Sequence, residues 1–75
     1  YGHPIHNFRL TAKLLNALLS EKLKEPLTEY DIPLMMIQVK IARELHSHKR
    51  DNIVDIAGYA NTQGMLYEWP RGCAI

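Results

Sequence analysis

Apolar residues recur at helical spacing in the first third of the chain. From Phe8 onwards they follow one another at intervals of four, three and four residues, which places them on one face of a helix. These residues are Phe8, Ala12, Leu15 and Leu19. Asn7 stands just before the pattern, where an N-cap is favoured, and Pro26 stops a helix that approaches it. The pattern therefore predicts a helix over about 7–24.

The second apolar stretch is broader than the first. From Leu34 to Leu45 the chain is apolar almost all round a helical wheel, and the polar residues fill one narrow stripe. That stripe consists of Lys40, Arg43, Glu44 and Ser47. Thr28 and Asp31 resemble a capping box, so we expect the helix to cover about 28–47. Because two neighbours cannot cover so wide an apolar arc, the pattern predicts a homodimer or a tetramer.

A third helical pattern runs over about 51–68. One face of it carries apolar and small residues, against which we expect another helix to pack closely. That face holds Ile53, Ile56, Ala57, Ala60, Gly64 and Tyr67. The opposite face includes Asp51, Asp55 and Tyr59, and Asp51 stands where an N-cap is expected.

These three stretches predict an all-α fold and a single helical domain over residues 1–75. Three short helices form a small bundle that buries only a modest core. The chain opens abruptly on Tyr1, so we expect that residues before it are missing. A missing N-terminal helix or oligomerisation would complete the bundle.

Composition and charge narrow the classes of partner. Of the 75 residues 47% are hydrophobic, and the net charge is only +1, so neither nucleic acid nor an anionic membrane is predicted as the main partner. No apolar run is long enough to span a bilayer. The single cysteine and the lack of a visible secretory signal predict a cytoplasmic protein. The four histidines lack the spacing of a zinc site, and we expect them to be solvated or to face phosphate.

Asp55 is the residue whose place in the third stretch calls for a chemical explanation. It lies one helical turn beyond Asp51, and like charges at that spacing repel, so a positive group is expected opposite. In one interpretation Asp55 pairs with Lys40 and Asp51 pairs with Arg43. In the other, Glu44, Asp51 and Asp55 bind Mg²⁺, which prefers oxygen ligands, and the two bases contact phosphate groups.

Three blocks of sequence resemble a small helical family that is encoded widely in bacteriophages and prophages. They are YGHPxxNF at 1–8, LMMxxxKIAR at 34–43 and RDNxVDIAGYA at 50–60. They occur in the same order as in that family, and the resemblance extends from Tyr1 to about Tyr67. Members usually carry a further helix before the first block.

That family is in turn similar to the MazG-like all-α nucleotide pyrophosphohydrolases. The resemblance implies a dimeric or tetrameric bundle in which acidic residues of two helices bind Mg²⁺ and split nucleoside triphosphates. Their pattern is EExxE followed by ExxD. Here Asn52 to Asp55 resembles the second motif with asparagine in place of glutamate, and the second helix offers Gln38, Lys40 and Glu44 where the first motif would stand.

We therefore predict a Mg²⁺-dependent nucleotide-phosphate-binding protein, with pyrophosphohydrolase activity as the implied reaction. In that role Lys40 and Arg43 act on the phosphates and Tyr59 contacts the nucleoside. Glu44, Asp51 and Asp55 are then the metal ligands. The alternative prediction is a non-enzymatic helical oligomeric module of phage origin, whose charges only fix the register of its helices.

Overall fold

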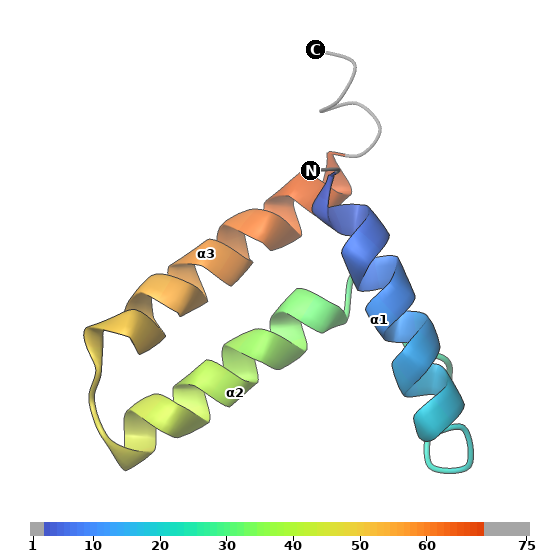
Figure 1. Ribbon diagram of the computed structural model, residues 1–75, viewed down its shortest axis with the longest axis horizontal. Helices are drawn as coiled ribbons and strands as arrows, with labels where there is room; N and C mark the ends of the chain where they lie inside the picture. Colours follow the sequence, from blue (N-terminus) through green and yellow to red (C-terminus); the bar gives the residue numbers. More distant parts are fainter. Residues whose placement is uncertain (1–2, 69–75) are drawn as a thin grey trace.

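The computed structural model describes residues 3–68, and the regular secondary structure in that part of the chain is all helical. Helix α1 covers Pro4–Leu18, α2 covers Ile32–His46 and α3 covers Arg50–Tyr67. The predicted all-α fold is confirmed. Helices α2 and α3 lie side by side as an antiparallel hairpin, and α1 diverges from them at a wide angle (Figure 1). The three helices therefore form an open arrangement rather than a closed bundle.

The hydrophobic core lies where α1 meets the open end of the hairpin. All three helices contribute to it, and its buried apolar members are Ile5, Phe8, Ala12, Ile32 and Leu66. Three partly buried residues, Leu15, Tyr30 and Tyr59, pack against it. The rings of Tyr30 and Tyr67 add a contact with their centroids 4.8 Å apart. This core fastens α1 to the hairpin near one end only.

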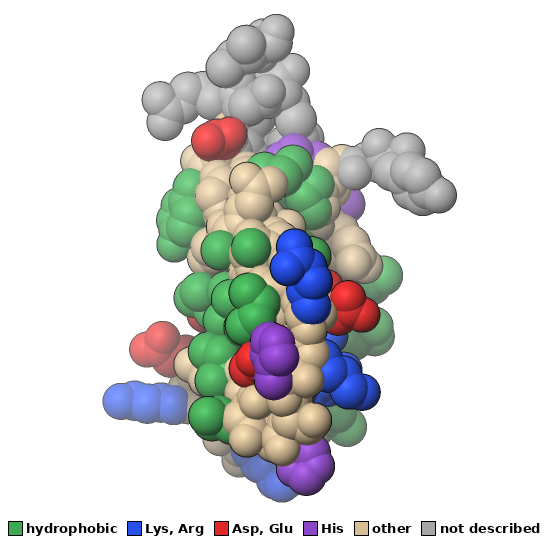
Figure 2. Space-filling model, turned by 90° about the vertical axis from the view of Figure 1, so that its left-hand side faces the viewer, with side chains coloured by type: hydrophobic (Ala, Val, Ile, Leu, Met, Phe, Trp, Pro, Cys, Tyr) green, Lys and Arg blue, Asp and Glu red, His purple; other side chains and the backbone are tan. Residues whose placement is uncertain are grey.

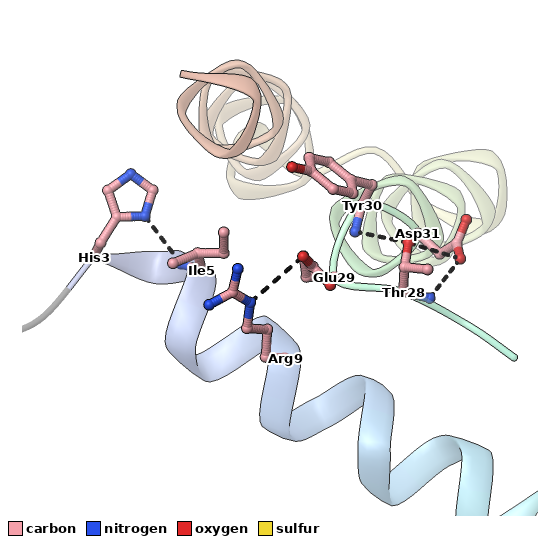
Figure 3. Close-up of polar contacts among 7 residues, drawn as sticks. All are labelled: His3, Ile5, Arg9, Thr28, Glu29, Tyr30 and Asp31. Atoms are coloured by element: carbon pink, nitrogen blue, oxygen red, sulfur yellow. Dashed lines mark hydrogen bonds and ion pairs between the residues drawn. The ribbon is translucent and has the colours of Figure 1, made fainter. Parts of the chain in front are cut away.

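Helix α1 begins earlier than the sequence pattern predicts. Pro4 occupies its first turn, where a missing N–H is tolerated, and His3 is the N-cap. The Ile5 N–H donates to His3 Nδ1 at 3.1 Å (Figure 3). The predicted cap at Asn7 is wrong because the helix already runs through that residue.

Helix α1 also ends sooner, at Leu18 rather than near residue 24. Asn16 supplies the reason. Its side-chain amide donates to the Leu27 carbonyl at 2.9 Å, and its carbonyl oxygen accepts the Leu27 N–H at 2.7 Å. This pair of bonds returns the chain to α1, so the backbone has to turn soon after Leu18.

The predicted capping box ahead of α2 forms, but as a turn that precedes the helix. Asp31 Oδ2 accepts the Thr28 N–H at 2.8 Å, and the Thr28 hydroxyl accepts the Tyr30 N–H at 3.3 Å (Figure 3). Regular helix starts only at Ile32, four residues later than predicted. Glu29 in the same turn accepts a bond from Arg9 Nε of α1 at 3.5 Å, so the turn also contacts α1.

Helix α3 faces its neighbours with a different side from the one predicted. Leu66 is fully buried and Asn52 is only 6% exposed, whereas Ile53 on the predicted packing face is 48% exposed. A Cβ added at Gly58 or Gly64 would meet no atom within 4 Å. The prediction of close packing on the small-residue face is therefore wrong for the described chain. The reverse face is held inward by the core and by polar contacts with α2.

Helix α2 turns Lys40 and Glu44 toward α3 and leaves much of its apolar side exposed. The Lys40 side chain is only 15% exposed, while Leu45 is 83% exposed. An amphipathic helix of a globular protein normally does the reverse. We name the exposed large apolar residues of this helix the outer arc of α2: Leu34, Met35, Val39, Ile41 and Leu45. A view onto the connected end of the hairpin shows hydrophobic side chains at the surface beside basic and histidine side chains (Figure 2).

Candidate functional site

The polar groups between α2 and α3 form what we name the polar seam: Lys40, Glu44, His48, Asn52 and Asp55. At its centre Lys40 Nζ lies 2.9 Å from Asp55 Oδ2. The lysine is largely shielded and the carboxylate is 42% exposed, so the pair lies at the rim of the interface between the helices. The predicted pairing of Asp55 with Lys40 is confirmed.

Glu44 accepts three bonds at the connected end of the hairpin. Its Oε2 contacts His48 Nδ1, and its Oε1 accepts the Lys49 N–H at 3.0 Å and an N–H of the Asn52 amide at 3.2 Å. Lys49 is the N-cap residue of α3 and its own side chain makes no capping bond. Glu44, which belongs to the preceding helix, therefore supplies the hydrogen-bond acceptor for a backbone N–H at the start of α3. The predicted N-cap at Asp51 is wrong, since that residue lies within the first turn.

These bonds lower the pKa of Glu44. The hydrogen bond from His48, then the one from the Lys49 backbone and a smaller one from Asn52, hold the pKa of Glu44 below its ordinary value of 4.5. Partial desolvation opposes the shift without reversing it. The carboxylate is thus stabilised in its charged form.

The lowered pKa predicts how stability depends on pH. A carboxyl group whose pKa is lower in the folded state stabilises the fold fully above its unfolded value, and this contribution is lost as the pH falls through the folded value. As the pH is lowered below 4.5, we expect the urea concentration at the unfolding midpoint to decrease more steeply for the wild-type chain than for Glu44→Gln. Parallel curves for the two proteins between about pH 3 and pH 6 would contradict the assignment.

The Lys40–Asp55 pair predicts a coupling that a double-mutant cycle can measure. Asp55→Asn leaves a shielded ammonium without its charged partner, so we expect it to lose about 1 kcal/mol of unfolding free energy. Adding Lys40→Met should restore most of that loss, because the unpaired charge is then gone. Glu25→Gln, in the exposed loop after α1, is the matched control and should change stability by less than about 0.5 kcal/mol. Strictly additive losses in the double variant would show that the contact contributes nothing.

The structure separates the two bases that the sequence grouped together. Lys40 lies in the polar seam, whereas Arg43 lines a different hollow together with His46 and Lys49. Within residues 3–68 no ion pair joins Arg43 to Asp51, which is exposed. The predicted second ion pair is therefore absent from the described structure.

Asp55 and Tyr59 do share a surface. Both line a shallow hollow of about 340 Å³ on α3, together with Val54, Gly58 and Thr62. Across the described residues, 3–68, no group of three or more histidine, cysteine, aspartate and glutamate side chains is placed to hold a metal ion. In a single copy Asp55 thus lies with Lys40 and Tyr59. The other two predicted metal ligands, Glu44 and Asp51, do not join it in a metal-binding group in the described part of the chain.

Sequence reasoning missed the role of Asn52 and His48 in the polar seam, and the bond from the Lys49 backbone to Glu44. The four-residue spacing of Glu44 and His48 was a usable signal, because residues at that distance on a helix are neighbours. The contact with Asn52 had no such signal, since it depends on how tightly the connection between the helices turns.

Comparison with known proteins places the chain in a family. A family model described as a domain of unknown function, DUF6378, matches residues 1–67. The chain belongs to the DUF6378 family. This DUF6378 chain is also similar to the Gene 55 protein of Mycobacterium phage D29, with 37% identity over 71 residues. The match covers 93% of this chain and 44% of the phage protein, so the chain spans less than half the length of that relative.

These findings support the predicted phage-associated family. They do not extend to the MazG-like enzymes, and no solved structure matches the chain. Among the helices of residues 3–68, none is both long enough and apolar enough to cross a bilayer.

Proposed function

We propose that this DUF6378 chain is a helical association module that works as a homo-oligomer, a dimer or a tetramer. One observation carries the proposal: α2 directs Lys40 and Glu44 toward α3, while the large apolar residues of its outer arc lie in solvent. Exposed apolar area of this kind marks an interaction surface in a folded protein. The hairpin is one layer of helices, and a helical domain needs a second layer to bury its apolar side.

A second copy of the chain is the occupant that we propose for the outer arc. The arc follows one side of a straight helix, so two copies related by a two-fold axis can lay the same surface against itself. Its members are large and apolar, and Gln38 is an exposed polar residue on the same side of the helix. Apolar helix faces of this composition pack against each other by interdigitation of their side chains.

Dilution tests the proposal through stability. If unfolding is coupled to dissociation, a hundredfold dilution lowers the stability of a dimer by about 2.7 kcal/mol, and the melting temperature falls with it. We expect a clear fall across that range, followed by circular dichroism at the helical band. A melting temperature that is independent of concentration would contradict association and would favour an additional segment of a longer protein as the occupant.

A second candidate function is a Mg²⁺-dependent nucleotide-phosphate site of the MazG-like type. The observation that favours it is the hollow that Asp55 and Tyr59 share, with a partly exposed carboxylate beside a lysine. The residues of one copy do not fit the metal, because Glu44 already accepts three bonds and no cluster of three ligands forms within residues 3–68. This candidate therefore requires that a neighbouring copy brings further carboxylates to Asp55. Lys40 would then be the phosphate contact from the same copy, and a second base such as Arg43 would have to come from the neighbour.

Thermal shift distinguishes the second candidate from the first. A nucleotide site should raise the melting temperature when Mg²⁺ and deoxynucleoside triphosphates are added together, by an amount equivalent to about 2.7 kcal/mol at a hundredfold excess over the dissociation constant. Asp55→Asn should abolish that rise while the oligomer persists. If no nucleotide stabilises the wild-type protein, this candidate is removed and the association module stands unaffected.

A further inference from the structure

A hollow of about 790 Å³ lies at the connected end of the hairpin and shares Asn52 with the polar seam. It is open to solvent and is lined by the last turns of α2 and the first residues of α3. Its lining residues are Val39, Ala42, Arg43, His46, Ser47, Lys49 and Asn52. The volume falls in the range of pockets that hold small molecules.

The charged side chains that line this hollow are both basic. Arg43 and Lys49 carry fixed positive charges, and no aspartate or glutamate is among the lining residues. Neither base pairs with a carboxylate anywhere in residues 3–68. The adjacent acid, Glu44, is engaged by His48, the Lys49 backbone and Asn52. The side chains of Arg43 and Lys49 are thus available to an anion.

The remaining walls supply an apolar floor and further donors. Val39 and Ala42 are three residues apart on α2 and therefore neighbours on its surface. His46 and Ser47 add polar groups that can donate to oxygen atoms. A ligand that matches both parts has an anionic head and a small apolar body.

We propose that this hollow binds a small phosphate monoester, with its phosphate on Arg43 and Lys49 and its apolar body against Val39 and Ala42. The Arg43 guanidinium suits two phosphate oxygens at once, and the Lys49 ammonium contributes a point charge. Phosphate fits better than a carboxylate because its higher charge and three oxygen atoms suit two cationic side chains that line the same hollow. The assignment does not depend on the association module, since all the lining residues belong to one copy.

The outer arc and the hollow share Val39, so a second copy is the competing occupant of the hollow. Burial of Arg43 and Lys49 against the like charges of a symmetry mate would leave these bases without counter-charges, which is costly. An anion removes that cost, whereas a second copy adds to it. The proposed contact between two copies therefore has to leave Arg43 and Lys49 uncovered, with Val39 at the boundary between that contact and the hollow.

Calorimetric titration of the full chain with phenyl phosphate and with inorganic phosphate, at constant ionic strength, tests the assignment. We expect phenyl phosphate to bind about tenfold more tightly than inorganic phosphate because its ring covers the apolar floor. Arg43→Gln and Lys49→Gln should each weaken phenyl phosphate by about tenfold or more. Lys13→Gln, an exposed lysine on α1, is the matched control and should leave the affinity unchanged.

Three results of these titrations would contradict the proposed site or part of it. Equal losses in Lys13→Gln and Arg43→Gln would indicate general attraction to a basic protein and would overturn the site. Equal affinities for the two phosphates would overturn the role of Val39 and Ala42. An absence of binding at millimolar phenyl phosphate, with the wild-type helical spectrum intact, would overturn the proposal as a whole. Sedimentation of each variant shows whether a lost signal reflects changed association instead.

Discussion

Replacing Leu66 by alanine is expected to unfold most of the protein at temperatures where the wild-type chain is folded. Leu66 is fully buried and packs with Ile5, Phe8 and Ile32, the residues through which the three helices meet. Truncation of a buried leucine costs about 2–5 kcal/mol, from lost burial and from the cavity that remains. A domain of this size is rarely more stable than about 3–5 kcal/mol, so the loss approaches the whole stability.

Leu18→Ala is the matched control for this substitution. It removes the same atoms from the end of α1, but Leu18 is 76% exposed, so we expect a change below about 0.5 kcal/mol. Urea unfolding of both variants at one protein concentration makes the comparison. Similar midpoints for the two would mean that the core does not lie at the junction of α1 with the hairpin.

The second large effect is expected at Ile41, in the middle of the outer arc of α2. Ile41→Glu would place a carboxylate, and by symmetry a second one, inside the proposed contact between two copies. A buried charge without a partner costs several kcal/mol, so we expect the dissociation constant to rise by about a hundredfold or more. The helical content at high concentration should persist, because Ile41 lies outside the core cluster of the single chain.

Ser20→Glu introduces the same charge in the exposed loop after α1 and serves as the control. It should leave the dissociation constant within about threefold of the wild-type value. Gel filtration with light scattering over a range of concentrations measures both variants. If Ile41→Glu and Ser20→Glu dissociate alike, the contact does not involve the outer arc.

Helical periodicity predicted the three elements because apolar spacing is a local property of the chain. The helix boundaries were harder to predict, because contacts between residues distant in the sequence determine them. Asn16 ends α1 by bonding to Leu27, and Glu44 starts α3 by accepting the Lys49 N–H. Each bond has one partner outside the helix that it limits, so the pattern of that helix alone does not predict it.

The helical wheels showed which residues share a face, but not which face turns inward. Charge reasoning succeeded for Lys40 and Asp55 because a carboxylate one turn inside a helix needs a positive partner. It failed for Asp51 and Arg43, which form no ion pair within residues 3–68. The assumption that apolar faces turn inward failed for α2 and α3, where polar groups on facing helices satisfy one another.

Sedimentation equilibrium of the wild-type chain tests the central claim most directly. That claim is that one copy presents the outer arc of α2 for contact with another. We predict a mass of two or four times the 8.7 kDa of the chain at micromolar concentration, with dissociation on dilution. A folded species of 8.7 kDa at every concentration, with its helical spectrum intact, would contradict the claim.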